Sequence, residues 1–240
     1  MKKYLVILRQ SLFQFLTYRL QIFLQVTQSF ITPLILLAVL SFPKSLVIYY
    51  ILVALTYPLV ISTIDEDIDN LSLNGDINNF LLKPIPLFRY LLTKNIGEKL
   101  SMALPIIPFI TITLIYNPPS SILAFIFSLP LAFILSFCFS YFIGLFCFWY
   151  DEFWPIHNLK FVLIQLLSGV AVPLYFFPTW SLSILKYTPF PYLAGWTARI
   201  TQNNYSYLDF IFATTWIIVL YGGCVLLEKS AINKYSYTAS

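Results

Sequence analysis

The stretch SILAFIFSLPLAFILSFCFSYFIGLFCFW (121–149) contains no charged side chain and is longer than a lipid bilayer requires. A transmembrane helix crosses the hydrocarbon core with about 20 predominantly apolar residues. We therefore expect residues 121–149 to form a membrane-spanning helix that tilts or bends to fit the bilayer. Pro130 is the predicted position of a kink, because proline removes a hydrogen bond from the helix backbone.

The rest of the chain has a similar composition. Of its 240 residues, 59% are hydrophobic and 10% are charged, and the mean hydropathy is +0.81. A soluble domain carries about 25% charged residues, so this chain could not cover its surface with polar groups in water. The sequence predicts an integral membrane protein. The net charge of +4 does not indicate nucleic-acid binding, because the basic residues are scattered at the ends of apolar runs.

Five further segments are long and apolar enough to span a membrane, or nearly so, and the sequence therefore predicts an all-α protein with six spans. The predicted spans are 20–42, 45–64, 100–116, 121–149, 161–178 and 208–227. The longer segments outside the spans are 1–19, the polar segment 65–99, the connection 150–160, the segment 179–207 and the tail 228–240, and short turns at 43–44 and 117–120 join the other spans.

The positions of lysine and arginine predict the orientation of the chain. Eleven of the fourteen lie in 1–19, 65–99, 150–160 and 228–240, and the other three are Lys44, Lys186 and Arg199. Cytoplasmic segments of membrane proteins carry an excess of lysine and arginine. We therefore expect both termini in the cytoplasm and the chain in a plasma membrane of the bacterial inner type.

The predicted spans contain no aspartate, glutamate, lysine, arginine or histidine, apart from Asp209 and Lys99 at their borders. Ion-driven carriers and pumps need such groups at membrane depth, so their absence argues against an ion-coupled transporter. The chain also lacks the GxxxxGK[ST] loop that holds nucleotide phosphates. If it performs work, a partner must supply the energy. The three cysteines, Cys138, Cys147 and Cys224, lie in apolar runs without CxxC spacing and are expected to be packed thiols.

Uncharged polar residues form stripes on two predicted spans. In the first span they are Gln21, Gln25, Gln28 and Thr32, and in the fifth they are Gln165 and Ser168. Two interpretations stay open for these stripes. They could form hydrogen bonds between helices, or they could line a translocation path or a subunit interface.

A third pattern, in the fourth span, consists of small residues at every fourth position: Ser128, Ala132, Ser136, Ser140 and Gly144. Small residues at this spacing let two helix backbones approach closely, so we expect this row to be a packing surface.

Four acidic residues open the polar segment 65–99: Asp65, Glu66, Asp67 and Asp69. A magnesium site of the kind used by membrane-embedded transferases needs converging carboxylates, and the sequence offers one acidic cluster only. We therefore favour a solvated helix terminus. A metal-dependent membrane transferase remains one alternative function, and a structural membrane assembly protein is another.

Further along this segment, Asp76 can cap a short helix that Lys83 and Pro84 end. Ile77, Phe80 and Leu81 share one face of this helix. The face would either rest on lipid or insert into another protein.

Two stretches resemble the permease subunits of type-2 ATP-binding-cassette exporters. The first is NGDINNFLLKPIPLFRYLLTKNIGEK (74–99), and the second is VPLYFFPTWSLSILKYTPFPYLAGWTARI (172–200). The pair Tyr18-Arg19 before the first predicted span is also similar to that family.

This resemblance implies a half-unit that pairs with a second permease, identical or related, and with two cytoplasmic ATPase subunits. It implies that ATP and magnesium bind the partner subunits, that this chain holds no cofactor, and that it is not itself an enzyme. Segment 1–19 would be an interfacial elbow helix, and 179–207 would be a pair of short outer re-entrant helices. Asp76, Ile77, Phe80, Leu81, Lys83 and Pro84 would belong to a coupling helix that enters a groove on the ATPase.

Overall fold

The computed structural model describes residues 2–17, 44–75, 85–116, 122–150, 152–202 and 204–238, together with residues 20, 24, 27, 31 and 77. This part of the chain is helical and contains no strand, which confirms the predicted all-α class for the described residues. The α-helices are α1 (Lys2–Thr17), α3 (Lys44–Val60), α4 (Ile64–Leu73), α6 (Leu87–Tyr116), α7 (Ile122–Gly144), α8 (Trp154–Leu167), α9 (Thr179–Leu185), α10 (Gly195–Thr201) and α11 (Tyr207–Thr238). Three short 3-10 helices join them: η1 (Leu145–Phe148), η2 (Leu174–Phe176) and η3 (Phe190–Tyr192).

Within the described residues, four helical stretches are long and apolar enough to cross a membrane. They are Leu46–Leu73, Leu87–Ile115, Ile122–Phe148 and Tyr207–Ala231, and they match the predicted second, third, fourth and sixth spans. The predicted first span lies almost wholly outside the described residues. At the predicted fifth span, α8 has 14 residues and ends at Leu167. The six-span layout therefore stays a prediction.

Two of these helices are longer than their predicted spans. Helix α6 begins at Leu87 instead of residue 100, and α11 continues to Thr238. The added residues include leucine, lysine, arginine and glutamate, which favour the helical conformation. The edge of the hydrocarbon region ends the apolar run but does not require the helix to end.

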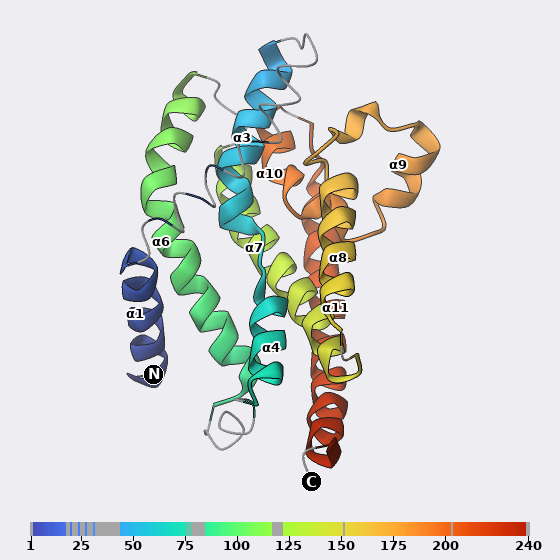
Figure 1. Cartoon of the computed structure of the whole chain (residues 1–240). Coiled ribbons are helices and arrows are strands. Elements are labelled where there is room, and N and C mark those ends of the chain that lie inside the picture. Colours follow the sequence, from blue (N-terminus) through green and yellow to red (C-terminus); the bar gives the residue numbers. More distant parts are fainter. Residues whose placement is uncertain are drawn as a thin grey trace.

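The long helices run side by side, with α4 below α3 and with α1 beside the lower part of α6 (Figure 1). Both termini lie toward the end of the bundle where α4 is found (Figure 1). Helices α1 and α6 are in close contact at Gly97, where a Cβ atom would lie 2.6 Å from the Cβ of Ser11. The elbow role of α1 stays a prediction.

Helix α7 lies at the centre of the bundle and packs against α3, α4, α10 and α11. The five small residues at every fourth position of this helix are all buried. The predicted packing role of this row is therefore confirmed. The three cysteines are also buried and free, as the sequence indicated.

The segment after α8 contains two short helices with different surroundings. Helix α9 exposes large side chains such as Trp180, whereas α10 is almost completely buried, with Trp196 in the core. Helix α8 ends next to Gly169, whose positive φ of 88° favours glycine. The hydroxyl of Tyr49 on α3 donates to the Gly169 carbonyl oxygen at 2.7 Å and fixes this end of α8.

Candidate functional site

The chain leaves helical geometry at residues 61–63, between α3 and α4. Pro58 lies in the last turn of α3 and cannot donate a backbone hydrogen bond, which favours the end of the helix close by. The Lys99 ammonium group of α6 donates to the carbonyl oxygens of Pro58, at 2.8 Å, and Ile61. A cation at a helix C-terminus bonds the last carbonyls and interacts favourably with the helix dipole. Lys99 therefore stabilises the end of α3.

Two serines of the α7 row bind the backbone of the break directly. The Ser62 N–H donates to Ser136 Oγ at 2.9 Å, and Ser140 Oγ donates to the Ser62 carbonyl oxygen at 2.6 Å. All three residues are buried. A buried backbone group without a partner is costly, so these two hydroxyls allow the chain to break its helix inside the bundle.

A buried ionic cluster lies directly after the break, in the first turn of α4. Asp65 of α4 is completely buried, and both of its carboxylate oxygens face α8. Lys160 Nζ donates to Asp65 Oδ1 at 2.5 Å, and His157 Nδ1 lies 2.7 Å from Asp65 Oδ2. The second ring nitrogen of His157 lies 2.9 Å from Glu66 Oε1. Two cations and two carboxylates thus form a neutral network between α4 and α8.

Helix α7 supports this network from a third side. Ser140 Oγ lies 3.3 Å from Lys160 Nζ and accepts a hydrogen bond from it. At Gly144, a Cβ atom would lie 2.8 Å from the Cα of Asp65. The small residues of α7 therefore let Asp65 reach its partners on α8.

His157 carries a proton on both ring nitrogens in this arrangement, because each nitrogen faces a carboxylate that can only accept. The hydrogen bonds to Asp65 and Glu66 raise the pKa of His157 to about 9, and burial opposes this effect. The residue lies in α8, outside the four candidate membrane spans.

This pKa predicts a pH-dependent contribution to stability. A histidine with a raised folded-state pKa stabilises fully below its unfolded pKa of about 6.5 and loses that contribution as the pH rises through the folded value. We expect His157→Gln to lower the melting temperature of the detergent-purified protein near pH 6, and the difference from wild type to shrink toward about pH 10. Thermal unfolding across this range measures it. A difference that grows with pH would contradict the assignment.

The ionic cluster corrects the interpretation of the acidic residues. We predicted a solvated helix terminus at 65–69, and this is wrong for Asp65, which is completely buried. Asp65 and Lys160 each lie one residue outside a predicted span, so the search for charges inside the spans missed them. His157 and Lys160 are three residues apart and share a face of α8, a spacing that marks a possible partner for a buried acid.

The same geometry bears on the metal-dependent transferase. Both Asp65 oxygens are already bound by cationic side chains. Among the described residues, no group of three or more histidine, cysteine, aspartate or glutamate side chains could hold a metal ion. The Asp65 carboxylate is therefore engaged in the ionic cluster, and the absence of a metal from this chain stays a prediction.

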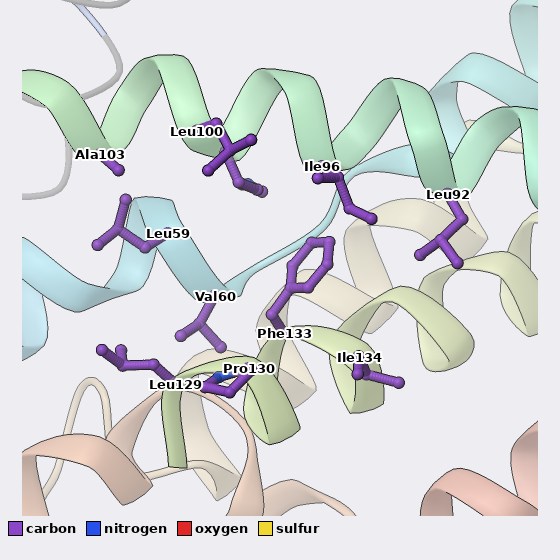
Figure 2. A pocket seen from close by; sticks show the side chains of 11 residues that line it. Leu59, Val60, Leu92, Ile96, Leu100, Ala103, Leu129, Pro130, Phe133 and Ile134 are labelled. Atoms are coloured by element: carbon purple, nitrogen blue, oxygen red, sulfur yellow. The ribbon is translucent and has the colours of Figure 1, made fainter. Parts of the chain in front are cut away.

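A groove of about 450 Å³ lies beside the break, between α3, α6 and α7. Figure 2 shows that its labelled side chains, among them Leu59, Ile96 and Phe133, are apolar and come from all three helices. Lys99 also lines it, but its ammonium group is bonded to the α3 carbonyls. The groove therefore suits hydrocarbon rather than an ion.

Comparison with known proteins identifies the family. Residues 36–239 match the family model described as ABC-2 family transporter protein. The chain belongs to this family. No curated protein and no solved structure matches this permease significantly. The membership and the apolar helices together show a membrane transport permease of the ABC type.

Of the two polar stripes predicted for the translocation path, the structure describes the one in the fifth span and not the one in the first. Gln21, Gln25, Gln28 and Thr32 lie outside the described residues. Gln165 Nε2 donates to the Tyr57 hydroxyl of α3 at 3.4 Å, and Ser168 is buried at the end of α8. Gln165 Oε1 and Ser168 Oγ have no hydrogen-bond partner among the described residues. Both interpretations of the stripes, helix packing and path wall, stay open.

The predicted coupling residues also lie mostly outside the described residues. Asp76, Phe80, Leu81, Lys83 and Pro84 are among those not described. Ile77 is described, and its side chain is 2% exposed. The docking role of the face that Ile77 shares with Phe80 and Leu81 stays a prediction.

Proposed function

We propose that the permease is the membrane-spanning half-unit of an exporter, which forms the substrate path with a second permease and is driven by a separate cytoplasmic ATPase. Membership in the ABC-2 family over residues 36–239 is the observation that carries this proposal. The absence of a GxxxxGK[ST] loop from the 240 residues supports the assignment of ATP and magnesium to a partner.

The exposed surface of the bundle is apolar, as contact with either lipid or a second permease requires. Helix α11 exposes large apolar side chains along its length, including Ile211, Ile218 and Leu226. Helix α6 does the same with Leu104, Phe109 and others. Contiguous apolar surface of this kind is expected to be covered by lipid or by another protein.

The nature of the substrate follows in part from the proposed path residues. Gln21, Gln25, Gln28, Thr32, Gln165 and Ser168 are uncharged side chains that donate and accept hydrogen bonds. Such walls suit an amphipathic, lipid-linked or glycan substrate better than a small ion. Whether the pair is a homodimer or a heterodimer does not alter this expectation.

The test is reconstitution of the tagged permease together with candidate ATP-binding-cassette ATPase subunits from the same organism. We expect the two chains to purify together and vanadate-sensitive ATP hydrolysis to appear in nanodiscs that contain both. An ATPase that works equally well without the permease and does not remain bound to it would contradict the proposal.

Labelling of single cysteines tests the proposed topology. In a background without the native cysteines, cysteines at Gln10, an exposed residue of α1, and at Ser72 and Ser236 should react only from the cytoplasmic side. Cysteines at Ser120 and Thr201 should react only from outside, because the lysine and arginine bias places them there. If the cysteines introduced at Ser72 and Ser120 react from the same side of the membrane, the six-span topology is wrong.

A further inference from the structure

Helix α4 connects two regions that an exporter must move together. Its N-terminal end lies at the break that Lys99, Ser136 and Ser140 hold in place. Its C-terminal end, at Leu73, leads directly into the proposed coupling segment. A displacement of that segment by an ATPase therefore reaches the bundle through α4 on one side and through α6, which begins at Leu87, on the other.

Helix α8 connects the cytoplasmic end of the bundle with the segment proposed to lie outside. It begins at Trp154 and ends at Leu167, seven residues before η2. From there the chain continues to α9 and to the buried helix α10. A movement of α8 is thus transmitted along the chain to the outer segment.

The ionic cluster is the polar connection between these two helices. Both oxygens of Asp65 bind donors on α8, and the two donors are one helical turn apart. Two bonds to donors three residues apart fix the rotation of α8 against α4 as well as their distance. Asp65 and Lys160 are both buried, so water cannot replace either bond.

Stability alone does not explain why this connection is ionic. Removing two charges from water costs about as much as their attraction returns, and apolar residues of similar volume often serve equally well. The ion pair fixes the relative orientation of α4 and α8, because its hydrogen bonds are directional. Apolar contacts are non-directional and would allow the two helices to shift against each other.

We propose that Asp65, Lys160 and His157 form a clamp that passes the movement of the coupling segment from α4 into α8 and on to the outer segment. The three side chains act as positioning residues for the transport cycle. This inference rests on the proposed function, because it requires an ATPase that displaces the coupling segment.

The experiment measures the response of the outer segment to nucleotide, so it needs no knowledge of the substrate. A single cysteine at Ser183, an exposed position of α9, is introduced into a cysteine-free permease that is reconstituted with its ATPase in nanodiscs. The rate of maleimide labelling is compared without nucleotide and with ATP plus vanadate. In the otherwise unaltered permease we expect nucleotide to change this rate.

The clamp is then removed by the double variant Asp65→Leu with Lys160→Met, which replaces the ion pair with apolar side chains of similar size. We expect this variant to retain the ATPase and to hydrolyse ATP, but its labelling rate should no longer respond to nucleotide. The exchanged variant, Asp65→Lys with Lys160→Asp, should recover part of the response. If the ion pair only stabilised the fold, removing it would change ATP hydrolysis and the nucleotide response of the labelling rate together. Loss of that response while hydrolysis continues therefore identifies the clamp.

The matched control is the other ion pair of α4, in which Lys94 Nζ lies 2.8 Å from Asp67 Oδ2 on the side of α6. Asp67→Leu with Lys94→Met should keep the nucleotide response. A full response in the folded Asp65/Lys160 variant would overturn the clamp while leaving the proposed function intact. Failure of the unaltered permease to bind the ATPase would instead overturn the proposed function and the clamp with it.

Discussion

Replacing Phe80 and Leu81 together by alanine should release the ATPase from the permease or leave ATP hydrolysis running without transport. The two side chains are large apolar residues of the proposed coupling face, which they share with Ile77. Large apolar anchors at the centre of an interface cost about 2 kcal/mol or more when truncated, which is roughly thirtyfold in affinity. The measurement is the amount of ATPase retained on the detergent-solubilised permease.

Two controls separate docking from folding. Asp69→Asn lies on α4, in the same cytoplasmic region, and should leave ATPase retention unchanged. Ile77→Ala should lower the melting temperature, because it removes a buried side chain. Suppose that Asp69→Asn abolishes activity while the Phe80 and Leu81 variant changes neither activity nor ATPase retention. The coupling assignment is then wrong, and the transferase alternative gains support.

Replacing Asp65 alone by alanine should destabilise the permease strongly. Lys160 and His157 would lose the carboxylate that lies between them, and only the half-exposed Glu66 would remain to balance two cations. Breaking a buried ion pair by removing one partner typically costs about 3–5 kcal/mol. Thermal unfolding of the purified variant, compared with Asp69→Ala on the same helix, measures this loss.

The double variant Asp65→Leu with Lys160→Met gives the opposite expectation for stability. Replacing both partners by apolar side chains removes the uncompensated charge, so most of the stability lost in Asp65→Ala should return. A double variant as unstable as the single one would show that the network depends on more than this pair. A single variant as stable as Asp69→Ala would contradict the buried ionic cluster.

The apolar pattern of the sequence was sufficient to predict the helical class and the four candidate spans. It also predicted the role of the α7 row, because small residues at every fourth position have few uses in a membrane helix other than close packing. Ser136 and Ser140 do more than pack, since their hydroxyls bind the backbone at Ser62. No local pattern indicates that function, because Ser62 is more than 70 residues away in the sequence.

The ionic cluster was missed for a related reason. Asp65 and Lys160 each border an apolar run, and a border residue is normally solvated, so each is unremarkable when considered alone. Only the fold, which places Asp65 of α4 opposite Lys160 of α8, brings their side chains within 2.5 Å of each other. Helices α6 and α11 also extend beyond the predicted spans 100–116 and 208–227, because hydropathy marks where the lipid ends and not where the helix ends.

Native mass spectrometry of the permease, purified in mild detergent with its ATPase, tests the central claim most directly. We predict a complex that contains two permease subunits, each of 27.8 kDa if the pair is identical, and two ATPase subunits. Phe80→Ala with Leu81→Ala should shift this complex toward permease without ATPase. A spectrum from the unaltered protein that contains only permease, at equal expression of both chains, would contradict the account.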